Sequence, residues 1–267
     1  MKSWTAWYKR VSASKQGHWE EIGIAQALAL TATDMAKDEP LMSAASYFWS
    51  YTLNTFLFNQ EPMTPTLLDI TMITGLDITS SANPVNLNTK NKFDFKTKSI
   101  GGWSGYVSMN LGDGSVSLRD HTAFLLMWLE KFLFCGARCG PTANWQHLAE
   151  KLVEKKQFPL GKYLLGYLYQ TLSNASAKIA YGTVIGTCGP WWLLQIWLNL
   201  ITKEVVDRPS LTEEDFPRFE LITDEDGEEV THCRCMSFGE AASRNTGAKL
   251  SAELLKDCFC NFYDGFP

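Results

Sequence analysis

Residues 190–201, PWWLLQIWLNLI, form one of the longest apolar stretches of the chain and decide its fold class. A helix built from them is apolar on every side, because Trp, Leu and Ile occupy positions around its whole circumference. Such a helix must be surrounded by other elements, so we expect it at the centre of a core, and we expect Trp191 and Trp192 to pack there rather than to stack on a cofactor. A dozen residues are too few to span a bilayer, so no membrane partner is expected.

Two further helices are predicted in the first third of the chain. Residues 41–58 carry apolar side chains over a surface wide enough for a helix that is buried on most sides. In residues 63–76, Thr64 suits the N-cap, Pro65 the first helical position and Gly75 the left-handed residue after the last turn. A short helix with defined ends is therefore expected there.

The middle of the chain carries similar signals. Ser117 and Asp120 form a capping-box pattern, and Thr142 is placed to cap another helix. Together with the spacing of apolar side chains, these signals predict helices over residues 117–134, 143–156 and 161–172. We therefore predict a mainly α fold, a compact multi-helix domain with a small β-hairpin element.

Charge divides the chain into two parts. Residues 1–202 hold 17 Lys and Arg against 14 Asp and Glu, whereas residues 203–267 hold 7 against 15, which gives the net charge of −5. This balance disfavours a surface devoted wholly to nucleic-acid phosphates. In the acidic part, residues 219–235 predict a hairpin over a Gly-containing turn, and residues 252–262 predict a final helix. We expect a helical core over 1–202 and an acidic extension over 203–267 that packs on it.

Six segments together form a specific ordered pattern: residues 45–49, 54–56, 63–76, 121–135, 160–169 and 188–198. In order and spacing they resemble the plant mobile domain, a family also labelled aminotransferase-like, which occurs in transposable elements and in host proteins similar to the maintenance-of-meristems group. The resemblance implies a nuclear location and a role in transposon silencing, gene-expression control and genome stability. It also implies nuclear protein partners, among them a PPP-type Ser/Thr phosphatase, and it supplies no catalytic residues.

The aminotransferase label prompts a test for pyridoxal phosphate, which needs a Schiff-base Lys, an acidic partner for the ring nitrogen and a phosphate cup. Lys162 follows Gly161 at the start of a predicted helix, where an exposed structural Lys is the simpler interpretation. The stretch Gly102-Trp103-Ser104-Gly105 departs from a nucleophile elbow at Tyr106. We therefore expect no cofactor and a non-catalytic interaction module, with an uncharacterised enzyme as an alternative.

Direct DNA binding is the other alternative. In one segment, lysines for phosphates alternate with aromatic rings for base stacking: Lys90, Lys92, Phe93, Phe95, Lys96 and Lys98. A short strand is expected around the two Phe. The helix over residues 64–76 is similar to the second half of a helix-turn-helix, although it has no Arg, Lys, Asn or Gln to read base edges. A solvated Lys-rich loop is the simpler interpretation of the segment.

Seven Cys follow an N-terminus without the apolar stretch of a signal peptide, so we expect reduced thiols. A zinc site is a weak alternative for Cys233, Cys235, Cys258 and Cys260. On a helix, two residues that are two apart point about 200° from each other, so we expect no metal. His121 and His147 are expected at the surface or half-buried, and Asp69 and Asp120 as electrostatic caps of their helices.

Overall fold

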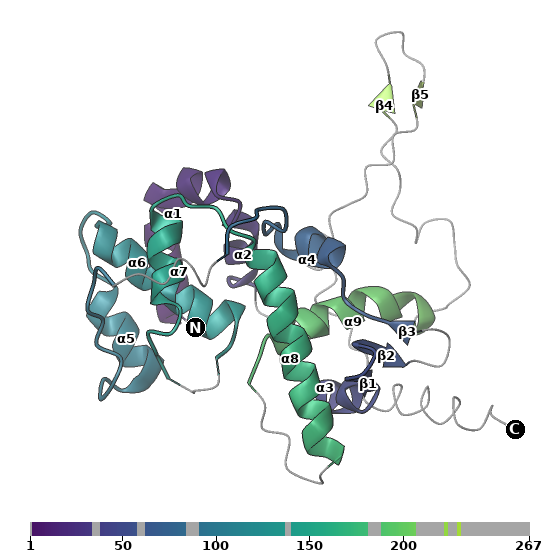
Figure 1. Ribbon diagram of the computed structural model, residues 1–267. Coiled ribbons are helices and arrows are strands. Elements are labelled where there is room, and N and C mark those ends of the chain that lie inside the picture. The colour runs from purple at the N-terminus through teal and green to yellow at the C-terminus, as the bar shows by residue number, and fades with distance from the viewer. Residues whose placement is uncertain are drawn as a thin grey trace, which may run out of the picture.

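The computed structural model describes residues 2–33, 38–57, 62–83, 91–136, 140–180, 188–206, 222–223 and 229–230, and these form the predicted mainly α fold with a small antiparallel sheet (Figure 1). The helices are α1 (Lys2–Glu21), α2 (Ala25–Leu30), α3 (Glu39–Tyr47), α4 (Leu67–Thr74), α5 (Gly102–Asn110), α6 (Leu118–Met127), the π-helix η2 (Trp128–Leu133), α7 (Gln146–Val153), α8 (Leu160–Ala180) and α9 (Trp191–Val206). The strands are β1 (Trp49–Ser50), β2 (Thr55–Leu57), β3 (Pro62–Met63), β4 (Ile222–Thr223) and β5 (Glu229–Val230).

Two groups of elements make up the described fold. Helices α1, α5, α6 and α7 pack together at one end, whereas α3, β1, α4 and α9 gather along the other side with the long helix α8 (Figure 1). Helix α2 contacts both α1 and α4 and joins the two groups. Within the described residues, no helix is both long enough and apolar enough to cross a membrane.

The first helix, α1, supplies two of the largest fully buried side chains among the described residues, although no helix was expected there from the sequence. Trp7 and Trp19 are fully buried, and Trp4 stacks on Phe124 of α6 with ring centroids 4.7 Å apart. Trp19 stacks on the same Phe124 at 5.4 Å. Helix α1 is therefore fixed to α6 by aromatic contacts, which have large buried areas and defined geometry.

The helix predicted over residues 41–58 is wrong in its second half. Helix α3 ends at Tyr47, and the chain then turns back on itself in an antiparallel β1–β2 pair that places Trp49 opposite Phe56. Their rings lie 4.9 Å apart and are buried, and Asn54 adopts a left-handed φ of 52° in the turn between the strands. Aromatic residues and Thr favour the pleated geometry, and Asn is among the residues that tolerate a positive φ.

Helix α4 begins two residues later than predicted. Thr66, rather than Thr64, is the N-cap, and it forms a capping box with Asp69. The Thr64 hydroxyl lies instead 2.8 Å from that of Tyr169 on α8, so it joins two elements rather than capping one. Gly75 is left-handed after the last turn, with a φ of 69°, as predicted.

The capping box of Ser117 with Asp120 is confirmed, and helix α6 continues through η2 almost to the predicted end at Phe134. Thr142 is not the N-cap of the following helix, because α7 begins only at Gln146. The hydroxyl of Thr142 donates instead to the carboxylate of Glu130. The predicted helix over 161–172 is part of the longer α8.

Helix α9 occupies the core, as its composition predicts. Leu193, Leu194 and Leu198 are fully buried, and Trp197 stacks on Phe56 of β2 with centroids 5.8 Å apart. Trp192 is half-buried against the core, and its indole nitrogen donates to the carbonyl oxygen of Leu133 at 3.1 Å. The antiparallel pairing of β4 with β5 confirms the predicted hairpin, whereas the final helix predicted over 252–262 lies outside the described residues.

Candidate functional site

Four exposed large apolar side chains belong to the β1–β2 hairpin and to the residue at the end of α3 that precedes it. Tyr47, Tyr51 and Leu53 are 64%, 66% and 63% exposed, and Leu57 is 39% exposed. We call these four side chains the hairpin patch. Residues 40–60 contain no Asp, Glu, Lys, Arg or His, so the patch lies in a stretch of chain without charge. Exposed large apolar side chains that occur together mark interaction surfaces.

The hairpin beneath the patch is held to the core at several points. The Leu57 amide donates to the Phe48 carbonyl oxygen at 2.9 Å. The Trp49 indole nitrogen donates to the Ser173 hydroxyl at 3.2 Å, and the Ser176 hydroxyl donates to the Trp49 carbonyl oxygen at 3.1 Å. Both Ser residues belong to α8, so the patch is presented by a fixed backbone. The patch could not be recognised from the sequence, because a helix was expected over residues 41–58.

The segment singled out for DNA contact has an irregular backbone in its described part, and the strand expected around Phe93 and Phe95 is absent from it. Phe95 is only 5% exposed, and the Arg119 guanidinium lies 4.8 Å from its ring centroid. Arg119 also donates to the carbonyl oxygen of Asp94 at 3.0 Å. The ring of Phe95 is therefore covered on one face by a cation of its own chain, and Phe93 is half-buried against the core.

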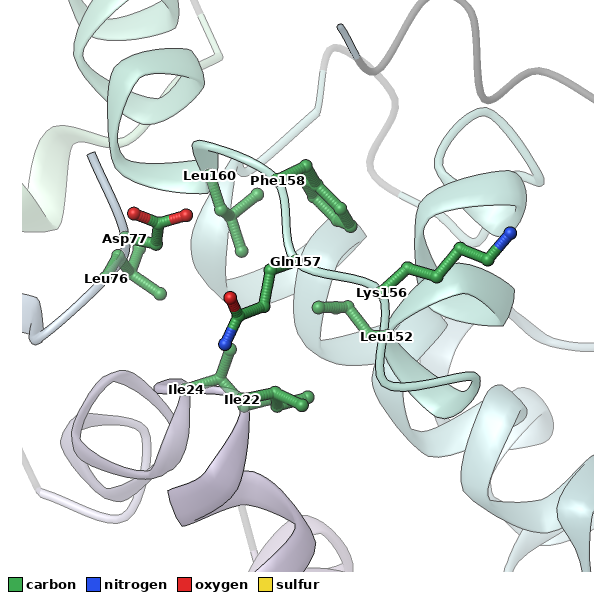
Figure 2. A pocket seen from close by; sticks show the side chains of 9 residues that line it. All are labelled: Ile22, Ile24, Leu76, Asp77, Leu152, Lys156, Gln157, Phe158 and Leu160. Atoms are coloured by element: carbon green, nitrogen blue, oxygen red, sulfur yellow. The ribbon is translucent and has the colours of Figure 1, made fainter. Parts of the chain in front are cut away.

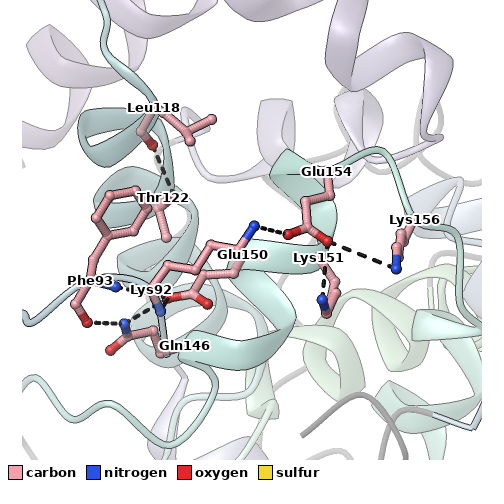
Figure 3. Close-up of polar contacts among 9 residues, drawn as sticks. All are labelled: Lys92, Phe93, Leu118, Thr122, Gln146, Glu150, Lys151, Glu154 and Lys156. Atoms are coloured by element: carbon pink, nitrogen blue, oxygen red, sulfur yellow. Dashed lines mark hydrogen bonds and ion pairs between the residues drawn. The ribbon is translucent and has the colours of Figure 1, made fainter. Parts of the chain in front are cut away.

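The same segment is tied to α7 by the carboxylates that Figure 3 shows. The backbone amide of Lys92 donates to Oε1 of Glu150 at 3.0 Å, and its ammonium group pairs with Glu154. Gln146 donates from Nε2 to the Phe93 carbonyl oxygen at 2.6 Å and to Glu150 at 2.9 Å. Hydrogen bonds from Lys92 and then Lys151 lower the pKa of the Glu154 carboxyl group. These contacts assign Lys92 a role in docking the segment.

Of the remaining lysines of the segment, the structure describes two and leaves one outside the described residues. Lys96 and Lys98 are exposed, and Lys90 lies outside the described residues. The structure thus brings Lys92, Phe93 and Phe95 into contact with α6 and α7 and leaves two cations facing solvent. Contact with DNA through this segment stays a prediction.

Glu130 is a buried carboxylate within the π-helix η2, with 4% of its surface exposed. It accepts hydrogen bonds from the Thr142 hydroxyl and from the Trp145 amide, the latter at 3.2 Å, and also from the amide of Asn144. Burial raises the pKa of this carboxyl group, and the three hydrogen bonds oppose that rise. The carboxylate therefore accepts hydrogen bonds from groups just before the start of α7, a helix whose N-cap residue makes no side-chain hydrogen bond.

His121 is buried, with 2% of its surface exposed, so the expectation of a surface or half-buried residue is corrected. Its Nε2 accepts a hydrogen bond from the Trp19 indole nitrogen at 2.9 Å, and its ring lies edge-on to His18 at 5.0 Å between centroids. Burial, with smaller contributions from His18 and Lys15, lowers the pKa of His121 to about 3. The imidazole is neutral at physiological pH and acts as an acceptor in the core.

A small pocket lies where α1, α4, α7 and α8 approach one another (Figure 2). Its cavity volume is about 10 Å³, which is room for about one water molecule. Substrate pockets usually hold about 300–1,000 Å³. The side chains of Ile22, Leu76 and Phe158 make its lining largely apolar, so this pocket belongs to the packing of the helices.

The other predicted site residues are placed as follows. Asp69 and Asp120 cap their helices as predicted, and Lys162 is exposed at the start of α8. Among the described residues, no group of three or more His, Cys, Asp and Glu side chains is arranged to hold a metal ion. The four cysteines of the weak zinc alternative, Cys233, Cys235, Cys258 and Cys260, lie outside the part of the chain that the structure describes.

A family model described as the plant mobile domain matches residues 23–246. The match includes all six segments of the ordered sequence pattern and continues past residue 202 into the acidic extension, where the sequence analysis recognised no family motif. Comparison with curated proteins and with solved structures finds no match. Because the family model covers most of the chain, the protein belongs to the plant mobile domain family.

Proposed function

We propose that this protein is a non-catalytic nuclear interaction module that acts through protein partners in transposon silencing, gene-expression control and genome stability. The observation that carries the proposal is the hairpin patch, in which Tyr47, Tyr51 and Leu53 are each more than 60% exposed. Family membership supports the biological setting, because this domain is associated with transposable elements and with host proteins of the meristem-maintenance group.

The chemistry of the patch favours a protein partner. Tyr is enriched among the residues that contribute most to protein interfaces, because its ring buries a large area at a low cost in side-chain entropy. Nucleic acid is bound mainly through cations at its phosphates, and residues 40–60 contain none. The Trp49 indole donates to Ser173, and Ser176 donates to the Trp49 carbonyl oxygen, so α8 holds the hairpin in place and ordering it on binding costs little free energy.

Two of the buried ionisable groups, Glu130 and His121, also support a non-catalytic role. Glu130 accepts hydrogen bonds from Thr142 and from backbone amides that precede α7, and the His121 ring accepts one from Trp19. Both side chains are therefore used in joining helices, and neither faces the pocket shown in Figure 2. A general acid or base needs contact with the reacting atoms.

A PPP-type Ser/Thr phosphatase is the proposed nuclear partner, on the basis of the family. The test is co-purification of the tagged full chain from plant nuclei, followed by mass spectrometry and by immunodetection of the phosphatase catalytic subunit. We expect the phosphatase or chromatin proteins to be recovered with the wild-type chain. Recovery of neither from nuclei in which the chain is expressed would contradict the proposal.

Direct DNA binding is a second candidate function, favoured by the exposed positions of Lys96 and Lys98 on one irregular segment. Binding through phosphates would weaken steeply between about 50 and 200 mM salt, because released counterions drive it. The test is fluorescence anisotropy with labelled duplex and single-stranded DNA at both salt concentrations, using the wild-type chain and Lys96→Ala/Lys98→Ala. Equal binding by both proteins would exclude DNA contact through Lys96 and Lys98, and no binding at about 50 mM salt would exclude direct DNA binding altogether.

A further inference from the structure

Two cysteines belong to the part of the chain that the structure describes, and both lie next to a residue that contacts helix α8. Cys135 comes just after η2, and Cys188 comes shortly before α9. The ring of Phe134, which precedes the first of them, lies edge-on to the ring of Tyr167 on α8, with centroids 5.6 Å apart. Cys135 is therefore one residue away from a contact with the middle of α8.

The residue that follows Cys188 contacts the next turn of the same helix. A Cβ on Gly189 would lie 2.4 Å from the side chain of Thr171, so the Gly189 backbone packs directly against Thr171. Tyr167 and Thr171 are four positions apart on α8, so they are neighbours on one helix face, with about 5–6 Å between their Cβ atoms. A disulfide joins cysteines whose Cα atoms are about 4.4–6.8 Å apart. The two contacts on α8 are spaced by a distance of that size.

Two further observations bring the same segments together. The Trp192 indole nitrogen donates to the Leu133 carbonyl oxygen at 3.1 Å, so the start of α9 touches the end of η2 directly. Burial raises the pKa of the Tyr167 phenol, and the negative charges of Cys188 and then Cys135 add to that rise. Both sulfur atoms therefore lie near one phenolic oxygen.

The two thiols differ in their access to solvent. Cys188 is exposed, whereas Cys135 is half-buried. The Cys135 Sγ donates to the carbonyl oxygens of Lys131 at 3.3 Å and Phe132 at 3.4 Å, which retain its proton. Oxidants reach exposed thiols first, and a second thiol nearby then resolves the oxidised sulfur. Cys188 is accordingly placed to react first and Cys135 second.

We propose that Cys188 and Cys135 form a peroxide-sensitive thiol pair, which hydrogen peroxide converts to a reversible disulfide between the end of η2 and the start of α9. The Cys188 sulfur attacks one peroxide oxygen, the O–O bond breaks and water leaves, so a sulfenic acid forms. The Cys135 sulfur then attacks the Cys188 sulfur, the S–O bond breaks and a second water leaves. Two electrons pass from the thiols to the peroxide, and both thiol protons end in water. The proposed function uses neither cysteine, so either proposal can fail without the other.

The test is oxidation of the purified chain, followed by mapping of its disulfides. The chain is reduced, freed of reductant, treated with about two equivalents of hydrogen peroxide and blocked with N-ethylmaleimide. Cleavage after Lys and Arg by trypsin then places Cys135 in peptide 132–138, Cys139 in 139–151 and Cys188 in 179–203. We expect the linked pair of 132–138 with 179–203 to exceed every other link of Cys135 or Cys188 at least tenfold, and dithiothreitol to remove it.

Three single variants separate the two steps. Cys188→Ser should abolish the linked pair and leave Cys135 open to N-ethylmaleimide. Cys135→Ser should leave Cys188 as a sulfenic acid, which dimedone captures. The matched control is Cys139→Ser, which removes a thiol close to Cys135 in the sequence and should leave the linked pair at its wild-type yield.

The wild-type chain alone also tests the fold dependence of the link, so the test does not depend on the folding of any variant. Oxidation in about 8 M urea should lower the yield of the linked pair at least tenfold, because the contacts with α8 are then lost. Equal yields with and without urea, no linked pair in the folded wild-type chain, or a dominant link to another cysteine would overturn the proposal. A linked pair that joins unlabelled to ¹⁵N-labelled chains in a mixture would assign the link to two copies and would also overturn it.

Discussion

The indole nitrogen of Trp19 donates a hydrogen bond of 2.9 Å to Nε2 of His121, and both side chains are buried. The two residues are 102 positions apart, in α1 and α6, so this bond joins the N-terminal helix to the middle of the chain. Because Nε2 accepts, it carries no proton, and the ring is neutral. Protonation of His121 would replace the acceptor by a second donor facing the Trp19 N–H.

This relationship predicts a specific pH dependence of stability. The pKa of His121 is about 3 in the folded chain and 6.5 in a model peptide, so the unfolded chain binds the proton more tightly. The stabilisation from the neutral ring is therefore complete above about pH 6.5 and is lost as the pH falls towards 3. At about 1.4 kcal/mol per pH unit, the free energy of unfolding falls by about 4 kcal/mol between pH 6.5 and 3.5 from this group.

The measurement is urea unfolding of the wild-type chain and of His121→Gln across that pH range. The Gln side chain keeps an acceptor for Trp19 but does not titrate, so its curve should be flatter by about the amount given above. The carboxyl groups of the chain titrate in both proteins, so their contribution to the pH dependence of the free energy of unfolding cancels in the difference between the two curves. If the free energies of unfolding of the two proteins fall in parallel with pH, then burial does not lower the pKa of His121.

Two substitutions of Glu130 should have different effects on the free energy of unfolding. Glu130→Gln keeps an oxygen acceptor and removes a charge whose burial raises the pKa, so the free energy of unfolding at pH 7 should change by less than about 1 kcal/mol. Glu130→Ala leaves the Thr142 hydroxyl and the Trp145 amide without this acceptor and should cost about 3 kcal/mol. Thermal and urea unfolding at pH 7 measure both, and equal losses would contradict the assigned role.

The pH dependence of stability that comes from Glu130 has the opposite sign to that of a carboxylate with a depressed pKa. Its pKa is raised in the fold, so the unfolded chain releases this proton first, and stability is lost as the pH rises from about 4.5 through the folded pKa. Glu130→Gln removes this loss. The difference in the free energy of unfolding between Glu130→Gln and wild type should therefore shift in favour of the variant as the pH rises above 4.5.

Helix α8 provides a matched pair of Gly substitutions. A Cβ on Gly161 would lie 2.7 Å from Cγ2 of Ile78 and 3.1 Å from the carbonyl oxygen of Asp77, whereas a Cβ on Gly166 would meet nothing within 4 Å. Gly161→Ala should destabilise the chain by about 1–3 kcal/mol through overpacking. Gly166→Ala should stabilise it by up to about 1 kcal/mol, because Ala is the better helix former. Changes of the same sign in thermal unfolding would contradict the packing of α8 against residues 77–78.

Removing the capping box of α6 should lower the free energy of unfolding by a smaller amount than the core substitutions above. Ser117→Ala removes the side-chain acceptor of the Asp120 amide, at 3.1 Å, and should cost about 1 kcal/mol. Ser115→Ala, two residues earlier in the same exposed loop, serves as the control and should change the free energy of unfolding by less than about 0.5 kcal/mol. Urea unfolding measures both, and a loss in Ser115→Ala as large as in Ser117→Ala would contradict the assignment of the cap.

The features predicted correctly from the sequence are those that short-range chemistry determines. The Ser117–Asp120 capping box, the left-handed Gly75 and the buried helix α9 each depend on residues close together in the chain. The hairpin at residues 49–57 was missed because its aromatic and apolar residues fit a helical period as well as a strand.

Long-range contacts account for the other errors. The burial of His121 depends on Trp19, which is far away in the sequence, and the predicted cap Thr142 instead binds Glu130 in another helix. Helix α1 was missed because polar residues separate its Trp side chains, and these pack on rings far away in the sequence, such as Phe124 of α6 and Tyr106 of α5. The exposed hairpin patch could not be predicted either, since an apolar residue in a sequence is ordinarily assigned to the core.

The most direct test of the proposed interaction module compares three tagged versions of the chain, expressed in plant cells and purified from their nuclei: wild type, Tyr51→Ser/Leu53→Ser and the control Leu118→Ser. Nuclear proteins that co-purify are quantified by mass spectrometry, with the PPP-type phosphatase followed by immunodetection. We expect wild type and Leu118→Ser to recover the same partners and the hairpin variant, at equal expression, to recover at least tenfold less of them. Equal recovery by all three chains would contradict the assignment of partner binding to the hairpin patch.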